Sequence, residues 1–218
     1  MNLPRVSINM AMTLDGKVVR PDGKWYGLSS RMDKRRMDEI RAEADALILG
    51  KNSLLNDDPV THIRYVPDAI EPRPILLVRN GSLPTDRKVF VHSKKKPLLF
   101  CTEKNEKEVR ADLSDLAEIR TAGKEDIAIE KILSELYDLG HRNVLLEGGP
   151  RLNDSFLRTN LVHRLYLTIV PFLIGQSDLT SITDGKSAFP NFDSARWRLA
   201  SCESKEDEIF LIYEKYSL

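Results

Sequence analysis

The sequence predicts an α/β protein built on a mixed, mostly parallel sheet, with helices on both faces and an antiparallel hairpin at its C-terminal end. Short, wholly apolar runs such as 46–49 are typical of strands that are covered on both faces. Segments with apolar residues at helical spacing separate these runs, which favours strands joined by helices. From Arg164 onward the pattern is all strand, and the polar turn 205–207 joins the last two strands.

The size and charge of the chain indicate one domain, 1–218, that acts on a small molecule. Its 218 residues are 41% hydrophobic, and Lys plus Arg and Asp plus Glu both total 33. The formal charge is therefore zero, so no overall field attracts nucleic acid or an anionic membrane. We interpret Cys101 and Cys202 as small buried residues in a reducing compartment. The apolar runs are too short to span a bilayer, and we expect a cytoplasmic protein.

Strands are predicted where apolar residues alternate or run together. Alternation over 6–12 indicates a half-buried strand, and Asp15-Gly16 supplies a hairpin turn before 17–19. The other predicted strands cover 46–49, 74–78, 97–101, 143–147, 165–170, 197–204 and 208–216.

Helices are predicted from caps and from apolar spacing. Ser30-x-x-Asp33 is typical of a capping box, which predicts a helix from Ser30 to about Ala44. A second helix is expected over 125–139, ended by Gly140, and a third opens at 148–150 with proline in its first turn. The charged residues expected on the outer side of the first helix are Lys34, Arg35, Asp38 and Arg41.

Polar residues follow the strand at 46–49 within one short loop. Lys51 and Ser53 offer a cation and a hydroxyl, and Asp57 and Asp58 offer carboxylates before proline ends any helix begun at 52. Because ligands of open α/β sheets bind beyond the carboxyl ends of strands, this loop is a candidate site. Ordinary turn chemistry is the alternative.

The strand at 143–147 ends in a second candidate set. Glu147 closes an apolar strand, so its carboxylate either reaches solvent or binds a ligand group. Gly148-Gly149 precedes a helix start, where backbone N–H groups and the helix dipole favour an anion such as a diphosphate. A plain turn is the alternative here. The two strand ends are expected to frame one cleft.

Two arginines are candidates for binding phosphate. Guanidinium groups form paired, charge-assisted hydrogen bonds to phosphate oxygens, which suits Arg41 and Arg64. Alternatively, each is an exposed surface charge. The histidines and cysteines show no metal-ligand spacing, so no metal site is predicted.

Four blocks of sequence carry a resemblance to a known family. They read NMAMTLDGK at 9–17, IRAEADALILG at 40–50, NDDP at 56–59 and LEGGPRL at 146–152. In order and spacing they resemble the reductase domain of riboflavin biosynthesis. That resemblance implies a dihydrofolate-reductase-like fold, usually a homodimer, which uses NADPH to reduce the ribosyl group of a phosphoribosylamino-pyrimidine to a ribityl chain.

The resemblance also implies roles for individual residues. The cofactor contacts it implies are Ala11, Ser53, Asp57 and the segment 149–155, which begins with Gly149, Pro150, Arg151 and Leu152, and the loop patterns add Lys51 and Gly148. The substrate-binding residues it implies are Asn9, Arg41, Thr61, Arg64 and Glu147. Lys51 and Arg79 are candidate cations for the 2′-phosphate that distinguishes NADPH from NADH.

The chain departs from the family in several places. Residues 23–29 read GKWYGLS where the family often has Gly-x-Ser-x-Trp-Ile-Ser, so those serine and tryptophan contacts are not transferred. The loop 57–61 lacks the usual leucine before its threonine. Asn9 stands where fused bacterial enzymes tend to have lysine, which favours a diaminopyrimidinone substrate over an aminouracil. The zinc motifs of the fused deaminase are missing, so no deamination is expected.

The expected chemistry is hydride transfer to C1′ of the ring-opened ribosylamine. An acid must protonate the sugar oxygen or the imine nitrogen, and Asp57 and Glu147 are both open for that role. Three other functions stay open: an aminouracil reductase, a dihydrofolate-reductase-like oxidoreductase on another small substrate, and a non-catalytic NADPH-binding module.

Overall fold

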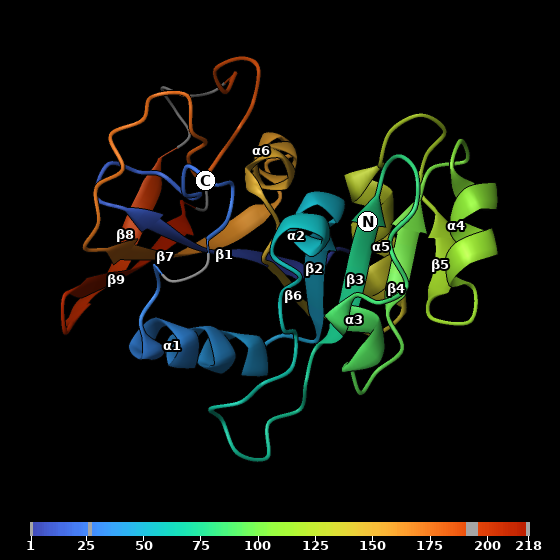
Figure 1. Ribbon diagram of the computed structural model, residues 1–218, viewed down its shortest axis with the longest axis horizontal. Helices are drawn as coiled ribbons and strands as arrows, with labels where there is room; N and C mark the ends of the chain where they lie inside the picture. The colour runs from blue at the N-terminus through green and yellow to red at the C-terminus, as the bar shows by residue number, and fades with distance from the viewer. Residues whose placement is uncertain (1, 26–27, 191–195, 217–218) are drawn as a thin grey trace.

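A computed structural model describes residues 2–25, 28–190 and 196–216. A nine-stranded sheet runs through this part of the chain in the order β5-β4-β3-β2-β6-β1-β7-β9-β8, and it forms the central layer in Figure 1. The seven strands from β5 to β7 are parallel, whereas β9 lies antiparallel between β7 and β8. The mixed, mostly parallel sheet predicted from the sequence is confirmed.

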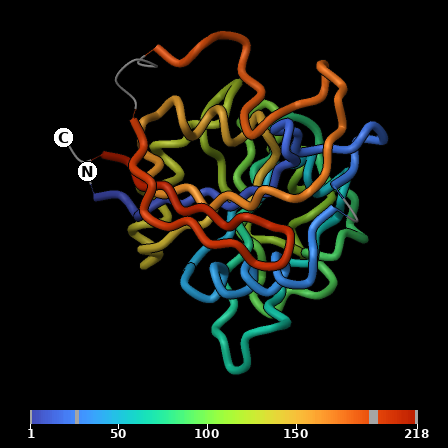
Figure 2. The backbone as a smooth tube through the Cα atoms, turned by 90° about the vertical axis from the view of Figure 1, so that its left-hand side faces the viewer, coloured from blue at the N-terminus to red at the C-terminus, as the bar shows by residue number. Residues whose placement is uncertain are grey.

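The strands agree closely with the predicted apolar segments. They are β1 (Arg5–Thr13), β2 (Ala46–Gly50), β3 (Arg73–Val78), β4 (Leu98–Cys101), β5 (Glu118–Thr121), β6 (Asn143–Leu146), β7 (Val162–Val170), β8 (Trp197–Lys205) and β9 (Glu208–Lys215). β8 and β9 form the C-terminal hairpin, which lies at one end of the sheet and faces the viewer in Figure 2.

Helices cover both faces of the sheet, as predicted. They are α1 (Arg31–Ala42), α2 (Lys51–Asn56), α3 (Lys88–Val91), α4 (Glu106–Leu113), α5 (Ile129–Asp138) and α6 (Pro150–Arg158). Buried residues of α1 to α4 belong to one core cluster and those of α5 and α6 to the other. We call the two sides the α1 face and the α6 face, and Figure 1 shows these two helices on opposite sides of the sheet.

The core explains the unbroken apolar run of β2. Leu47 and Leu49 pack on the α1 face and Ile48 on the α6 face, and none is more than 1% exposed. Successive side chains of a strand point to opposite faces, so a strand between two helical layers has no polar side.

Some predicted elements differ from the structure. The turn at Asp15 is present, but 17–19 forms no strand; instead the Asp15 carboxylate accepts a hydrogen bond from the Gly175 N–H at 2.7 Å. The helix predicted from 125 begins only at Ile129. α3, α4 and β5 were not predicted, because each is short and buries only one or two apolar side chains.

Two predictions about burial were wrong. Asp38 and Arg41 were expected on the outer side of α1, but they are 0% and 1% exposed. Cys101 is buried as expected, whereas Cys202 is exposed on β8. In the part of the chain that the structure describes, no helix is long and apolar enough to cross a bilayer.

Candidate functional site

The ends of β2 and β6 lie side by side at one edge of the sheet. The strands are parallel, and Ile48 of β2 pairs with Leu146 of β6. The pairing extends one residue further, because the Glu147 N–H donates to the Ile48 carbonyl at 3.0 Å. The two candidate loops of the sequence, after residues 50 and 147, are therefore brought together as predicted.

Glycines let the loop after β6 approach its neighbours closely. A Cβ atom at Gly148 would lie 2.6 Å from Leu152 Cδ2, and one at Gly50 would lie 3.2 Å from the same atom. A Cβ atom at Gly149 would lie 3.5 Å from Ser53 Oγ. The predicted cofactor residues at these two strand ends thus form one compact group, in which Gly148 tolerates no side chain.

The N-terminus of α6 lies within this group. Gly149 is its N-cap residue and Pro150 occupies the first turn, as predicted. In the described residues no side chain caps this end. Pro150 has no N–H, and the Leu152 and Asn153 N–H groups donate to the Gly149 carbonyl at 3.0 and 3.1 Å, which leaves the Arg151 N–H of this turn for an anion. Arg151 is mostly exposed, and its Nε lies 3.0 Å from Asp184 Oδ2.

Glu147 is fixed by two side chains on the α1 face. Arg41 donates from Nη2 to Glu147 Oε2 at 2.6 Å and from Nε to both carboxylate oxygens at 3.1 Å. Asn9 of β1 donates from Nδ2 to Oε1 at 3.3 Å. Both oxygens of Glu147 are therefore occupied by donors, which is typical of an ionised carboxylate.

Arg41 is placed differently from the phosphate-binding residue that the sequence suggested. Its guanidinium is buried, and its Nη1 donates to the Val60 carbonyl at 2.9 Å and lies 3.7 Å from Asp38 Oδ1. Asp38 also accepts from the backbone N–H groups of Arg64 and Tyr65 at 2.7 and 3.1 Å. Arg41 thus anchors Glu147 and the loop after α2. The Arg64 side chain is 33% exposed, and its Nε lies 3.6 Å from Asp38 Oδ2.

The other polar residues of that loop make hydrogen bonds within the protein. Asp57 Oδ1 accepts from the Trp25 N–H at 3.3 Å, and partial burial raises the pKa of Asp57 more than that bond lowers it. Asp58 accepts from the Lys88 N–H at 2.9 Å and so caps α3. Thr61 is buried, and its hydroxyl lies 3.0 Å from Ser93 Oγ. Of the altered segment after Trp25, Tyr26 and Gly27 lie outside the described residues.

The two candidate cations for a 2′-phosphate lie near the end of β3. Lys51 donates from Nζ to the Asn80 carbonyl at 2.7 Å, and its Nζ lies 2.9 Å from where a Cβ atom of Gly81 would be. Arg79 Nη1 lies 3.8 Å from Asp126 Oδ1, and both side chains are exposed. Lys51 directly follows β2, beside the cofactor residues predicted there, whereas Arg79 follows β3.

Asp33 was not identified as a site residue from the sequence. It lies in the first turn of α1, and burial raises the pKa of its carboxyl to about 6, opposed by a hydrogen bond to the Thr168 side chain. The nearby carboxylates of Glu208 and Glu147 raise that pKa further, and Arg36 lowers it. The pattern Ser30-x-x-Asp33 predicted a helix cap, and no other signal in the sequence distinguished this carboxyl.

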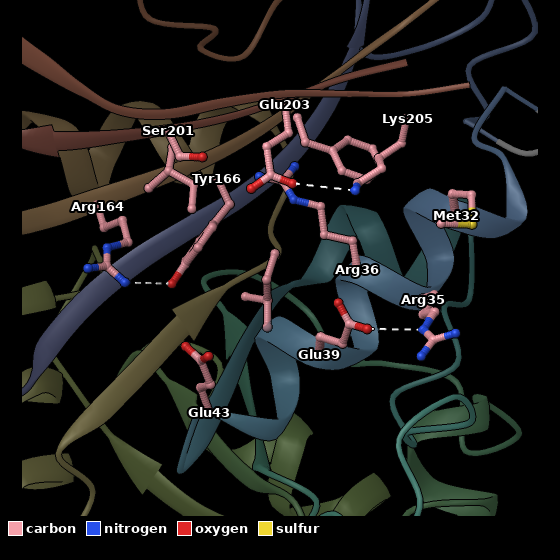
Figure 3. Close-up of a pocket in the computed structure, with 13 residues that line it drawn as sticks. Met32, Arg35, Arg36, Glu39, Glu43, Arg164, Tyr166, Ser201, Glu203 and Lys205 are labelled. Carbon is pink, nitrogen blue, oxygen red and sulfur yellow. Dashed lines mark hydrogen bonds and ion pairs between the residues drawn. The ribbon is translucent and has the colours of Figure 1, made fainter. Parts of the chain in front are cut away.

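A large groove of about 510 Å³ lies between α1 and the strands β7, β9 and β8 (Figure 3). The described residues that line it include none of the predicted site residues. Side chains of both charges face each other across it: Arg35, Arg36, Arg164 and Lys205, with Glu39, Glu43 and Glu203. No group of three or more His, Cys, Asp or Glu side chains in the described residues is placed to hold a metal ion.

Comparison with known proteins assigns the family. A model of the RibD C-terminal domain matches residues 4–211. The chain is also 30% identical, over 211 residues, to the 2,5-diamino-6-ribosylamino-4(3H)-pyrimidinone 5′-phosphate reductase of Methanothermobacter thermautotrophicus, covering 96% of this chain and 97% of that one. The chain belongs to the RibD C-terminal domain family. The resemblance of the four sequence blocks is thereby confirmed.

Solved structures confirm the fold expected for the RibD C-terminal domain family. Acinetobacter baumannii RibD superposes with a TM-score of 0.81 at 21% identity, over 98% of this chain and 58% of that chain. The dihydrofolate reductase of Enterococcus faecalis gives a TM-score of 0.51 at 12% identity, over 98% and 97% of the two chains. The dihydrofolate-reductase-like fold predicted from the resemblance is correct.

Proposed function

We propose that this protein is an NADPH-dependent reductase of riboflavin biosynthesis. Its substrate would be 2,5-diamino-6-(5-phosphoribosylamino)pyrimidin-4(3H)-one, whose ribosylamino group becomes ribitylamino. Family membership supports the reaction class, and the relative at 30% identity carries the name of this activity. The structural observation behind the proposal is the pairing of β2 with β6, which sets the glycine-lined loops beside the Asn9, Arg41 and Glu147 cluster.

The residues at the strand ends fit a dinucleotide. Gly148 and Gly149 carry no side chain at the start of α6, where a diphosphate would meet the Arg151 N–H and the positive end of the helix dipole. Ser53 Oγ lies beside Gly149, and Lys51 supplies the nearest cation for a 2′-phosphate. When bound, NADPH would supply the hydride that reduces C1′ of the substrate.

The residues on the α1 face would hold the substrate. Asn9 in the middle of β1 lies beside Glu147, which follows the last residue of the adjacent strand β6, and Arg41 fixes the Glu147 carboxylate in one orientation. A carboxylate held in this way accepts hydrogen bonds from hydroxyl or amino groups of a substrate without reorganising. We assign the phosphate to Arg64, whose side chain is 33% exposed and touches Asp38 only through Nε at 3.6 Å, because the Arg41 guanidinium is buried and bound through all three of its nitrogens.

Turnover assays with three substrates test the proposed function. We expect loss of reduced-nicotinamide absorbance with the phosphoribosylamino-diaminopyrimidinone, a slower loss with the phosphoribosylamino-uracil, and none with dihydrofolate. The reverse order of the two pyrimidines would make the protein an aminouracil reductase. Tight NADPH binding without oxidation of NADPH in any assay would identify a non-catalytic binding module.

Replacement of Arg64 tests the assignment of the phosphate. Removing one charged hydrogen-bond donor typically costs about 1.5–3 kcal/mol, so Arg64→Ala should raise the KM roughly tenfold to a hundredfold. The same substrate without its phosphate should bind both proteins alike. Lys94→Ala, which removes an exposed cation elsewhere, is the matched control. An unchanged KM in Arg64→Ala would remove this residue from the phosphate site.

We further propose that the protein is a cytoplasmic homodimer. The resemblance to the riboflavin reductases, which are usually homodimers, supports this, and we assign the contact between two copies to the groove beside α1, which side chains of both charges line (Figure 3). Sedimentation equilibrium of the wild type and of Arg35→Glu tests this. A monomeric wild type would contradict the dimer, and an unaffected dimer in Arg35→Glu would place the interface elsewhere.

A further inference from the structure

Asp38 of α1 lies between the two groups that are proposed to bind the substrate, the Glu147 carboxylate and the Arg64 guanidinium. Its side chain is 0% exposed, and its Oδ1 lies 3.7 Å from Arg41 Nη1. Arg41 in turn donates to Glu147 at 2.6 Å. On the other side, Asp38 Oδ2 lies 3.6 Å from Arg64 Nε. A continuous series of ion pairs therefore joins the end of β6 to the loop after α2.

The Asp38 carboxylate also fixes the backbone of the loop after α2. Its Oδ2 accepts from the N–H groups of Arg64 and Tyr65 at 2.7 and 3.1 Å. Earlier in the same loop, the Val60 carbonyl accepts from Arg41 Nη1 at 2.9 Å. Two buried side chains, one turn apart on α1, thus hold the loop at two points. The position of Arg64 relative to the end of β6 is therefore fixed by α1.

The side chain of Arg64 is oriented from two sides. Its Nε faces Asp38, and its Cζ lies 5.4 Å from the centre of the Tyr65 ring. In the part of the chain that the structure describes, the Arg64 side chain makes no hydrogen bond and no other ion pair. A guanidinium held at Nε keeps both Nη groups free, and such a pair of donors can bind a phosphate through two hydrogen bonds.

The charges around Asp38 are only partly compensated within the protein. Its Oδ1 has no hydrogen-bond partner in the described residues. Arg41 lies between two carboxylates, those of Asp38 and Glu147, so the three buried side chains together carry one excess negative charge. Arg64 supplies a further cation at 3.6 Å, but its side chain is 33% exposed. A buried group of this kind is seldom a source of stability, so its presence calls for another explanation.

We propose that Asp38 is a positioning residue that sets the distance between the Glu147 carboxylate and the phosphate-binding guanidinium of Arg64. A substrate reaches both groups only when its phosphate lies at the matching distance from the hydroxyl or amino groups that Glu147 binds. Asp38 thereby makes the protein selective for the phosphorylated form of a pentosylamine, without touching the substrate itself. This role rests on the proposed function and on its assignment of the phosphate to Arg64.

The dependence of KM on the substrate phosphate tests the proposal. Asp38→Asn keeps an oxygen that can accept from the two backbone N–H groups, but it removes the charge that faces Arg64. Its KM for the phosphoribosylamino-diaminopyrimidinone should rise about threefold to tenfold, because a neutral acceptor binds roughly half as strongly as a charged one. Its kcat, and its KM for the same substrate without the phosphate, should stay unchanged. A residue that only supported the fold would affect both substrates alike.

Asp45→Asn is the matched control. Asp45 likewise accepts from two successive backbone N–H groups, those of Arg142 and Asn143, each at 2.7 Å. It precedes β2, at the end of the strand opposite to the site, so its loss should weaken folding without altering either KM. In an Arg64→Ala background, Asp38→Asn should raise KM no further, because the guanidinium that it orients is gone.

Two further measurements do not depend on turnover. Asp38→Asn leaves Arg41 paired with Glu147, so the variant should fold, and urea unfolding checks this. Calorimetric titration with ribose 5-phosphate should show a dissociation constant that rises by the same factor in Asp38→Asn and stays unchanged in Asp45→Asn.

The possible results separate this role from the proposed function. An unchanged KM in Asp38→Asn, or an equal rise for the substrates with and without phosphate, would overturn the role of Asp38. An equal rise in Asp45→Asn would overturn it too, because any weakening of the fold would then have the same effect. A wild type that binds ribose 5-phosphate but turns over neither pyrimidine would instead overturn the proposed function.

Discussion

Glu147 at the end of β6 and Asp33 at the start of α1 lie on the same face of one sheet, but their surroundings are opposite. Glu147 is bound directly by the guanidinium of Arg41. At Asp33, burial and two nearby carboxylates raise the pKa more than the Thr168 hydroxyl and Arg36 lower it. Two acids on one face of the sheet thereby differ in whether their surroundings favour the charged form.

The largest expected effect comes from breaking the Glu147 contact. Glu147→Gln removes the carboxylate that binds the buried Arg41 guanidinium at 2.6 Å and leaves it the more distant Asp38 at 3.7 Å, and removal of one partner of such a pair typically costs about 3–5 kcal/mol. Urea unfolding should show this loss of stability. The double variant Arg41→Met with Glu147→Gln should recover part of it, because no buried charge is then unpaired. A single variant as stable as the wild type would show that the pair contributes nothing to folding.

Replacement of Asp33 should change the free energy of unfolding in the opposite direction. Its folded-state pKa of about 6 exceeds the ordinary value of 3.8, so ionisation at neutral pH opposes folding. Asp33→Asn should therefore stabilise the protein by about 2–3 kcal/mol at pH 7.5. The gain should develop between pH 4 and pH 6 and vanish below pH 4, where both forms of the wild type are protonated. A gain that is equal at pH 3.5 and pH 7.5 would exclude this cause.

Gly148 and Gly149 offer a matched pair beside Glu147. Gly148→Ala places a Cβ atom 2.6 Å from Leu152 Cδ2, and such overpacking typically costs about 1–3 kcal/mol. NADPH affinity should fall as α6 shifts. Gly149→Ala, with 3.5 Å to Ser53 Oγ, should change stability by less. Calorimetric titration and urea unfolding measure both effects, and equal losses in the two variants would contradict the close packing at Gly148.

The smallest effect is expected from removing the N-terminal cap of α1. Ser30→Ala removes the hydroxyl that accepts from the Asp33 N–H and donates to Glu208, and loss of such a cap typically costs about 1 kcal/mol. Ser155→Ala, on the exposed side of α6, is the control and should cost almost nothing. Thermal unfolding distinguishes the two. A loss in Ser155→Ala as large as in Ser30→Ala would mean that the cap is not the cause.

The arrangement of the strand ends was predictable from the sequence. The apolar runs ending at Gly50 and Leu146 indicated parallel strands, and parallel strands with helical connections place their carboxyl ends at one edge. The glycines and polar residues that follow the runs then fell at that edge. Local patterns were sufficient because each strand and its loop are contiguous in the chain.

The burial and the hydrogen-bond partners of the charged residues were not predictable from the sequence. Arg41 lies at a helix position that suggested exposure, and its burial depends on Glu147, 106 residues later. Asp33 matches a capping pattern, but Glu208 of β9 accepts the hydrogen bond from the Ser30 N–H in its place. Periodicity along the sequence gives the face of a helix but not the partner that a distant strand presents to it.

The hydrogen bonds from Ser30 to Glu208 join residues 178 positions apart. During synthesis on a ribosome, α1 therefore emerges long before the strand that completes its first turn. Until β9 arrives, Asp33 is free to close the capping box itself, as local sequence favours. We expect nascent chains that stop before residue 208 to lack the long-range cap, so that the final hairpin fixes the first turn of α1 to the sheet.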